Sequence, residues 1–274
     1  KILIAFIYPS LIALALIYLV ESILAAVGLL FFYSGPKLSF RTVPNLVVSK
    51  NLLLESMPLI FSTIFVTIYM KIDQVFLEHL VNTEAVGIYS AAVKISEMPF
   101  FVGVLLTNAA FPIIMRSKKL SEATYERDLQ LLFSIVVMLG IAIATLVSIF
   151  SPWIVYLIFG SEFAAASTVL RIHIWSIVFV FLGVAQGAWV IGEKRSSISL
   201  MATLIGAIIN ILLNILLIPK YGVLAAAIST VFSYAVSGYF INFWFKSTRI
   251  VVRMQTQAFL PHILFRELHR KNLI

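Results

Sequence analysis

Long stretches of this sequence contain no charged residue, and they are the feature that most constrains how the chain can fold. A helix needs roughly 20 apolar residues to cross the hydrocarbon core of a bilayer. Soluble domains are about a quarter charged, whereas only 12% of these residues are charged and 61% are hydrophobic. The sequence therefore predicts an all-α, polytopic membrane helical bundle. The longer charge-free stretches are 2–20, 22–36, 56–70, 98–115, 129–161, 172–192, 196–219 and 221–245.

Allowing a few embedded charges, the apolar stretches predict about seven membrane-spanning helices, with ends uncertain by roughly four residues. Residues 1–33 are longer than one span and contain Pro9, so residues 1–9 fit a preceding element. The stretch 129–161 is also long, and Pro152 is a candidate for breaking its end. Because the chain begins at Lys1, directly in an apolar stretch, we expect it to be the C-terminal part of a longer protein. The predicted spans are 10–33, 53–77, 87–115, 129–158, 165–191, 196–218 and 222–245.

Lysines and arginines are distributed unevenly over the predicted connections. Such residues are enriched in the cytoplasmic loops of membrane proteins. The connections after the first, third and fifth spans, together with the tail, hold three quarters of them, whereas the opposite side holds only Lys1 and Lys220. We therefore expect residue 1 outside and the C-terminus in the cytoplasm. The basic side carries Lys37, Arg41, Lys50, Arg116, Lys118, Lys119, Arg127, Lys194, Arg195, Lys246, Arg249, Arg253, Arg266, Arg270 and Lys271.

Residue types that carry catalysis or bind metals are scarce. The chain has no cysteine, which excludes disulfides, thiolate metal sites and cysteine nucleophiles. Its four histidines are scattered and lack metal-ligand spacing. The net charge of +8 follows the membrane topology and does not indicate nucleic acid. We expect no enzyme activity, no metal, no cofactor and no nucleic-acid partner. The histidines are His79, His173, His262 and His269.

The tail, residues 250–274, mixes apolar side chains such as Phe259 and Leu264 with basic residues. A basic amphipathic segment of this kind lies on the anionic inner leaflet of a membrane. A solvated tail that stops the last span fits the same residues. The two alternatives stay open at the level of sequence.

Charged residues inside a span cost several kcal/mol and mark functional sites by default. Glu21 stands near the middle of the first span with no basic residue near it in the sequence, so it must pair with another helix, be protonated or face water. Lys94 and Glu97 are three apart and share a helix face. They either neutralise each other, or Lys94 faces an aqueous cavity. Arg171 either reaches the interface with its long side chain or serves a site.

Lys71 and Asp73 form a different kind of pair. Two residues apart on a helix is roughly 200°, so the two side chains point to nearly opposite faces and cannot pair with each other. One reaches the headgroups, and the other must look inward or toward another helix.

Two polar features lie in the last two spans. Asn210 and Asn214 are four apart, and amides in hydrocarbon need partners. They either bond to a neighbouring helix or contact a substrate. Small residues also recur every four positions in the last span, which is typical of a helix-packing face. They are Ala225, Ser229, Ser233 and Ser237.

Two segments resemble a known family. The segment IYMKIDQVFLEHLVNTEAVGIYSAAVKISEMPFF, followed by NAAFPIIM, is similar to the second half of bacterial polysaccharide flippases of the Wzx type. NILLNILLIPKYGVLAAAIST is a second, separate match. The resemblance covers roughly residues 1–246. These flippases belong to the MOP exporter superfamily, together with the MATE drug antiporters and the lipid II flippase MurJ.

The resemblance implies a fold of two six-helix bundles that face each other across a central cavity. In that register the seven spans are helices six to twelve, and five N-terminal helices are missing. The implied domains are 1–50, the last helix of the N-lobe with its cytoplasmic connection, then 51–246, a six-helix C-lobe, and 247–274, a basic amphipathic tail. The recurrent positions of the family are matched by Asp73, which takes the place of the aspartate following the seventh helix, and by Gly87, Tyr89, Ala92, Lys94, Asn210, Asn214, Pro219, Tyr221 and Gly222.

The function implied is the flipping of a polyprenyl-diphosphate-linked oligosaccharide across the bacterial cytoplasmic membrane by alternating access. Membrane lipids, a polysaccharide polymerase and glycosyltransferases are the other partners implied. After the resemblance, Asp73 is predicted to face inward or to meet a donor from another helix, while Lys71 reaches the outer headgroups. The substrate-binding candidates are Lys94, Arg171, Asn210 and Asn214, and the candidates for charge relay or ion coupling are Asp73, Glu97 and Glu21.

Two other functions fit parts of the sequence. A cation-coupled multidrug antiporter of the MATE type would use the same acidic residues for ion-coupled efflux. A seven-span receptor fits the number and orientation of the spans, but the last span has no lysine for a retinal Schiff base and no N-P-x-x-Y, and the chain has no cysteine for an extracellular disulfide.

Overall fold

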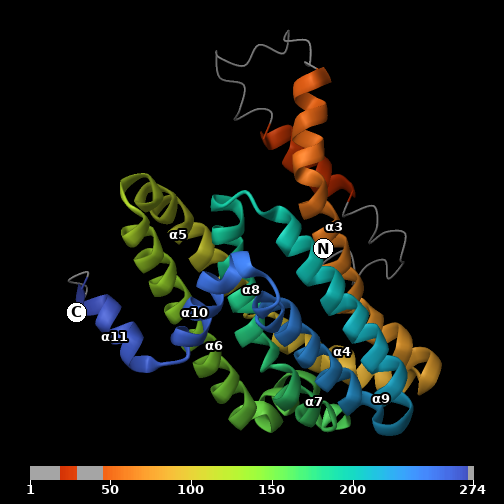
Figure 1. Cartoon of the computed structure of the whole chain (residues 1–274). Helices are drawn as coiled ribbons and strands as arrows, with labels where there is room; N and C mark the ends of the chain where they lie inside the picture. The colour runs from red at the N-terminus through yellow and green to blue at the C-terminus, as the bar shows by residue number, and fades with distance from the viewer. Residues whose placement is uncertain (1–18, 30–45, 271–274) are drawn as a thin grey trace. The chain divides into compact units, whose positions relative to one another are not determined.

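A computed structural model describes residues 19–29 and 46–270 of the chain (Figure 1). The chain divides into two compact units, residues 1–53 and 54–274. In the first unit, residues Leu19–Leu29 form an apolar helix in which the side chain of Glu21 is exposed. Most of the predicted span 10–33 lies outside the described residues.

The described part from residue 46 onward is helical throughout, apart from turns. This confirms the prediction of an all-α chain. The α-helices are α3 Leu46–Leu80, α4 Thr83–Glu97, α5 Phe100–Leu120, α6 Glu122–Phe159, α7 Ala166–His173, α8 Ser176–Gly192, α9 Ser196–Gly238, α10 Arg249–Ala258 and α11 Pro261–Arg270. Short 3₁₀ turns occupy Ser161–Phe163, Phe240–Phe243 and Lys246–Thr248.

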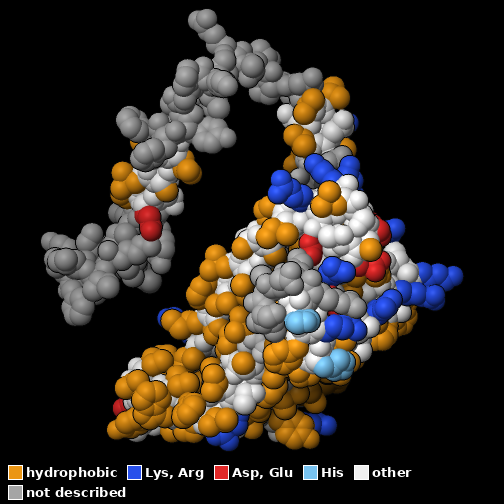
Figure 2. Space-filling model, turned by 90° about the vertical axis from the view of Figure 1, so that its left-hand side faces the viewer, with side chains coloured by type: hydrophobic (Ala, Val, Ile, Leu, Met, Phe, Trp, Pro, Cys, Tyr) orange, Lys and Arg blue, Asp and Glu red, His pale blue; other side chains and the backbone are white. Residues whose placement is uncertain are grey.

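Helices long and apolar enough to cross a membrane confirm that the protein is multi-pass. In the described residues they are Ser56–Leu80, Thr83–Leu120, Glu122–Phe159, Ala166–Gly192 and Ser196–Phe243. Figure 2 shows a flank covered with hydrophobic side chains, with lysines and arginines gathered in one region beside it. Large apolar side chains such as Trp153 and Leu216, each 63% exposed, need lipid rather than water around them.

Helix α9 contains two spans rather than one. Its 43 residues would reach roughly 65 Å as a straight helix, about twice the hydrocarbon core. At Gly222 the backbone leaves the helical region (φ 57°, ψ −132°), and the chain reverses direction there, as Figure 1 shows. We call residues 196–221 the first arm of α9 and residues 223–238 the second arm. Gly206 of the first arm packs against Ser233 and Ser237 of the second, so the arms match the predicted spans 196–218 and 222–245.

Local signals set several helix ends. Asn82 caps α4, accepting a hydrogen bond from the Ala85 N–H at 2.8 Å. Ser121 caps α6 through the Thr124 N–H at 3.2 Å, so the helix begins at Glu122, seven residues before the predicted start of that span at residue 129. Pro152 does not break α6, which continues to Phe159 and ends at Gly160 with φ 82°. The expected break is wrong, because a proline near a helix end removes only one backbone hydrogen bond.

Helix α8 packs against α5, α6 and α9 and forms the centre of the bundle. Its Phe181, Leu182 and Ala185 are fully buried. Two glycines make room for the ring of Phe181: a Cβ at Gly103 of α5 would meet that ring at 2.5 Å, and one at Gly140 of α6 at 3.4 Å. This central position lets α8 reach both the buried polar groups of α9 and the tail.

The tail forms two helices that dock on the bundle. Both α10 and α11 contact α6. Val251 and Ala258 of α10 are fully buried, and the Gln130 amide of α6 donates to the Met254 carbonyl at 3.1 Å. Neither sequence-based alternative for the tail, membrane surface or solvent, included this packing, because both considered the segment alone.

Candidate functional site

A buried carboxylate lies where α3, α4 and both arms of α9 meet. Asp73 of α3 has no exposed surface. The Tyr89 hydroxyl of α4 donates to its Oδ2 at 2.6 Å. From α9, the Asn214 amide donates to Oδ1, and the Thr230 hydroxyl donates to Oδ2. We call Asp73, Tyr89, Asn210, Asn214 and Thr230 the Asp73 cluster.

The sequence of α9 explains how its residues reach this carboxylate. Asn210 and Asn214 are one turn apart on the first arm, and the Asn214 amide also donates to the Asn210 Oδ1 at 3.2 Å. The reversal at Gly222 then returns Thr230 on the second arm to the same level. The Thr230 Oγ1 also lies 3.1 Å from the Tyr89 hydroxyl. Three helical segments distant in sequence thus converge on one side chain.

The cluster is rich in oxygen and contains no basic residue. Among the described residues Asp73 forms no ion pair, so only neutral donors surround its carboxylate. The Asn214 Oδ1 and the Asn210 Nδ2 are buried without a hydrogen-bond partner. Carboxylate, amide and hydroxyl oxygens are the ligands that hard cations prefer. The cluster can therefore hold either a proton on Asp73 or a small hard cation between these oxygens.

A second polar contact lies beside the cluster. The Ser96 Oγ of α4 is 2.7 Å from the Nδ1 of His173, which ends α7 and is 1% exposed. The rings of His173 and Tyr89 meet edge to face, with centroids 6.0 Å apart. No group of three or more His, Asp or Glu residues that could hold a metal occurs in the part of the chain that the structure describes.

The structure brings only some of the predicted site residues together. Asp73, Asn210 and Asn214 meet in the cluster. Lys94 on α4 and Arg171 on α7 are exposed and outside it. Glu21 lies in the first unit, on the described helix Leu19–Leu29.

Lys94 and Glu97 do not form an ion pair, although they share a face of α4. Lys94 is exposed, whereas Glu97 is half-buried and lies within electrostatic range of Lys71 and Asp73. Lys71 is exposed and Asp73 is buried, as their helical angle predicts. Helix α3 continues to Leu80, so Asp73 lies inside the helix instead of following it.

The sequence pattern identifies Tyr89 only as part of a motif and does not identify Thr230 as a site residue. Thr230 lies among small residues that were interpreted as a packing face. The chain reverses at Gly222, and the number of residues from Gly222 to Thr230 determines which residues of the first arm Thr230 faces. That distance could have placed Thr230 at the level of Asn214. Tyr89 is buried, and the hydroxyl of a buried tyrosine needs a hydrogen-bond partner.

Comparisons with known proteins agree on one group. The family described as polysaccharide biosynthesis protein matches residues 1–118. The capsular polysaccharide biosynthesis protein CapF of Staphylococcus aureus is 24% identical over 223 residues, 80% of this chain and 54% of CapF. The probable low-salt glycan biosynthesis flippase Agl15 of Haloferax volcanii is 26% identical over 221 residues, 80% of this chain and 47% of Agl15. The chain is therefore similar to polysaccharide biosynthesis proteins and glycan flippases.

A solved MATE structure in the bent conformation shares the fold of this chain. The two share a TM-score of 0.59 at 20% identity, over 80% of this chain and 51% of the other. The bundle described above is therefore MATE-like. The chain spans about half the length of CapF and of Agl15.

Proposed function

We propose that the protein carrying this chain moves a polyprenyl-diphosphate-linked oligosaccharide across the cytoplasmic membrane for polysaccharide biosynthesis. The observation that carries this proposal is the match of residues 1–118 to the polysaccharide biosynthesis family. The matched residues include α3 and α4, which contribute Asp73 and Tyr89 to the cluster. The relative named as a glycan flippase supports the same substrate class.

The mechanism proposed is alternating access, in which a helical bundle rocks around a site near the membrane midplane. No covalent bond is made or broken, so the protein acts as a transporter and not as an enzyme. Lys94 and Arg171 are exposed cations and remain the candidates for holding the diphosphate. Asn210 and Asn214 are fully buried, so contact with a substrate would require the cluster to open.

We assign ion coupling to Asp73. An ionised carboxylate deep in a bundle, with only neutral donors, is costly. A proton or a small cation removes that cost and thereby strengthens the packing of α3 against α4 and α9. Loss of the ion weakens it. Whether Asp73 holds an ion therefore changes how strongly α3 packs against α4 and α9. Coupling of an ion to a conformational change requires such an ion-dependent contact between helices. Glu97, half-buried and within electrostatic range of Asp73, is the second candidate.

The proposed location is the cytoplasmic membrane, with the C-terminus in the cytoplasm. The distribution of lysines and arginines supports this orientation. It puts the α10–α11 tail on the side where lipid-linked oligosaccharides are assembled, where glycosyltransferases and, after transfer, a polymerase act on the same substrate.

The test is transfer of a fluorescent lipid-linked oligosaccharide between leaflets of liposomes that contain the protein at its full natural length. The proposal predicts transfer well above protein-free vesicles. Efflux of a cationic dye, measured in the same vesicles, is the antiporter control. Dye efflux without oligosaccharide transfer would favour the drug antiporter and contradict the proposal.

A further inference from the structure

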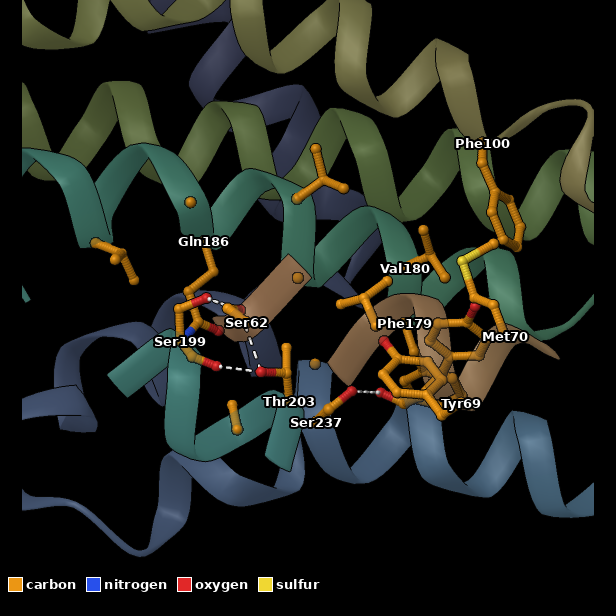
Figure 3. A pocket seen from close by; sticks show the side chains of 18 residues that line it. Ser62, Tyr69, Met70, Phe100, Phe179, Val180, Gln186, Ser199, Thr203 and Ser237 are labelled. Carbon is orange, nitrogen blue, oxygen red and sulfur yellow. Dashed lines mark hydrogen bonds between the residues drawn. The ribbon is translucent and has the colours of Figure 1, made fainter. Parts of the chain in front are cut away.

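A cavity of about 250 Å³ lies in the second unit between α3, α8 and the two arms of α9 (Figure 3). Phe100 of α5 borders it as well. The Asp73 cluster does not line it, although Tyr69 of α3, one helical turn before Asp73, does. The function assigned so far leaves this cavity without a role.

One end of the cavity carries hydroxyl and amide groups. The Ser62 Oγ lies 3.1 Å from the Ser199 Oγ, and the Thr203 hydroxyl donates to the Ser62 Oγ at 3.1 Å. Figure 3 shows Gln186 beside these three side chains. The Gln186 amide nitrogen donates one hydrogen to the Asn242 Oδ1 at 2.9 Å and has two to give. This end therefore offers both donors and acceptors.

The other end carries aromatic rings. Tyr69 meets Tyr234 edge to face at 5.0 Å, and Phe100 meets Tyr234 in the same way at 6.2 Å. Figure 3 shows the rings of Tyr69, Phe100 and Phe179 together, with Ser237 hydrogen-bonded to Tyr69. None of the lining residues is a lysine, arginine, aspartate or glutamate.

We propose that this cavity binds a single uncharged sugar residue. A sugar ring presents hydroxyls, which donate and accept, and C–H faces, which pack on aromatic rings. A cavity with hydroxyl and amide groups at one end and rings at the other matches both features. The inference rests on the proposed function, because it makes the cavity a subsite for the oligosaccharide part of the substrate.

Charge and size exclude the other parts of that substrate. A diphosphate needs cationic partners, which the lining lacks. Pockets for drug-sized ligands measure roughly 300–1,000 Å³, so about 250 Å³ suits one ring rather than an oligosaccharide. A polyprenyl chain offers no hydrogen-bonding group to the hydroxyl and amide end, whereas the hydroxyls of a sugar do.

A glycine of α8 provides a direct way to fill the cavity. A Cβ placed at Gly187 would meet no atom within 4 Å, and Gly187 lines the cavity. Gly187→Leu therefore adds a side chain at the cavity wall, where its Cβ has room. Gly87 on α4 also has nothing within 4 Å of a Cβ but lies outside the cavity, so Gly87→Leu is a matched control.

The experiment is saturation-transfer NMR on the purified, full-length protein in detergent, with N-acetylglucosamine and methyl glucoside as neutral probes and glucose 1-phosphate as the charged one. Neutral sugars should give transfer signals that Gly87→Leu preserves and that Gly187→Leu weakens roughly tenfold, equivalent to about 1.4 kcal/mol of binding. Thr203→Val, which removes one hydroxyl and keeps the shape, should weaken them in the same direction. Thr203→Val therefore tests the proposal on its own if Gly187→Leu does not fold.

Two results would overturn the proposal: no signal from either neutral sugar on protein that melts cooperatively, or signals that Gly187→Leu and Thr203→Val leave unchanged. A signal from glucose 1-phosphate alone would also overturn it. The NMR experiment measures sugar binding in detergent and does not depend on flipping. Failure of flipping in liposomes with intact sugar binding therefore contradicts the proposed function, and the reverse result contradicts only this subsite.

Discussion

At the scale of single residues, the charges inside the spans have very different surroundings. Lys71 and Asp73 are two positions apart on α3, yet one is exposed and the other fully buried. The helical angle predicted this separation. It did not predict the donors that meet Asp73, because they come from residues 16, 141 and 157 positions away.

Replacing Asp73 with asparagine tests the assignment of ion coupling to its carboxylate. The amide has nearly the same shape and can keep hydrogen bonds to Tyr89 and Thr230, so the fold should survive with a change in unfolding free energy below about 2 kcal/mol. Binding of a proton or cation should be lost. Thermal melts in detergent, over a range of pH and sodium concentration, should show a dependence for the wild type and none for Asp73→Asn.

Asp73→Leu is the informative control. It removes the carboxylate to which Tyr89, Asn214 and Thr230 all donate, at roughly 1–3 kcal/mol for each donor left unpaired. Its melting temperature should fall clearly below that of Asp73→Asn. Equal melting temperatures for the two variants would mean that the cluster is not formed as described.

Gly238, at the end of the second arm of α9, is a site of close helix contact. A Cβ there would lie 2.4 Å from the Phe179 carbonyl oxygen of α8, a backbone atom that cannot move alone. Gly238→Ala should therefore cost roughly 1–3 kcal/mol, as overpacking does. Gly87→Ala, in open space inside α4, should melt at or above the wild type, because alanine favours a helix by up to about 1 kcal/mol over glycine. If both variants melt together, α8 and α9 do not approach this closely.

At the scale of elements, three buried amides connect the tail to the bundle. Gln186 of α8 and Asn242 exchange two hydrogen bonds, at 2.9 and 2.8 Å. Gln255 of α10 donates to the Gln186 Oε1 at 3.1 Å and to the Gly238 carbonyl at 3.0 Å. All three side chains are nearly or fully buried. Because Gln186 also lines the cavity, the tail and the cavity share one side chain.

Gln255→Leu should loosen α10. The substitution keeps the apolar stem but removes the amide, leaving buried partners unpaired at roughly 1–3 kcal/mol. Hydrogen–deuterium exchange should become faster over 249–258 while α6 and α8 keep their protection. Gln257→Leu, at a partly exposed position on the same helix, is the control and should leave exchange unchanged. Unchanged exchange in Gln255→Leu would contradict the role of the amide network.

The helices themselves were largely predictable from the sequence, and their contacts were not. Charge-free stretches set the number and order of the spans from residue 46 onward, because the bilayer demands a fixed apolar length. The helix ends differ from the predicted ends of the spans where a capping residue sets the boundary, as Ser121 does for α6. The docking of α10 depends on amides 13 and 69 positions from Gln255, which no local pattern contains.

At the scale of the whole molecule, the cavity and the Asp73 cluster use the same helices. Tyr69 and Asp73 are one turn apart on α3, and Tyr234 and Thr230 are one turn apart on the second arm of α9. Tyr69 and Tyr234 pack edge to face between the cavity and the cluster. A change in how α3 packs on α9 therefore affects both sites at once, which is the physical requirement for coupling an ion to a substrate.

The proposed orientation can be measured because the chain has no cysteine. Lys220, at the end of the first arm of α9, and Lys194, between α8 and α9, are both exposed. A membrane-impermeant maleimide should label Lys220→Cys in intact cells and Lys194→Cys only after permeabilisation. The opposite labelling pattern would show that the topology is inverted, and it would contradict the proposed cytoplasmic location of the tail.

The most direct measurement of the central claim is flipping of a lipid-linked oligosaccharide in liposomes with an imposed proton or sodium gradient. It compares the full-length wild-type protein with Asp73→Asn. The wild type should accelerate transfer when one of the gradients is present, and Asp73→Asn should transfer at the same rate with and without it. Gradient-driven flipping that persists in a folded Asp73→Asn variant would contradict the claim that this buried carboxylate couples the ion to transport.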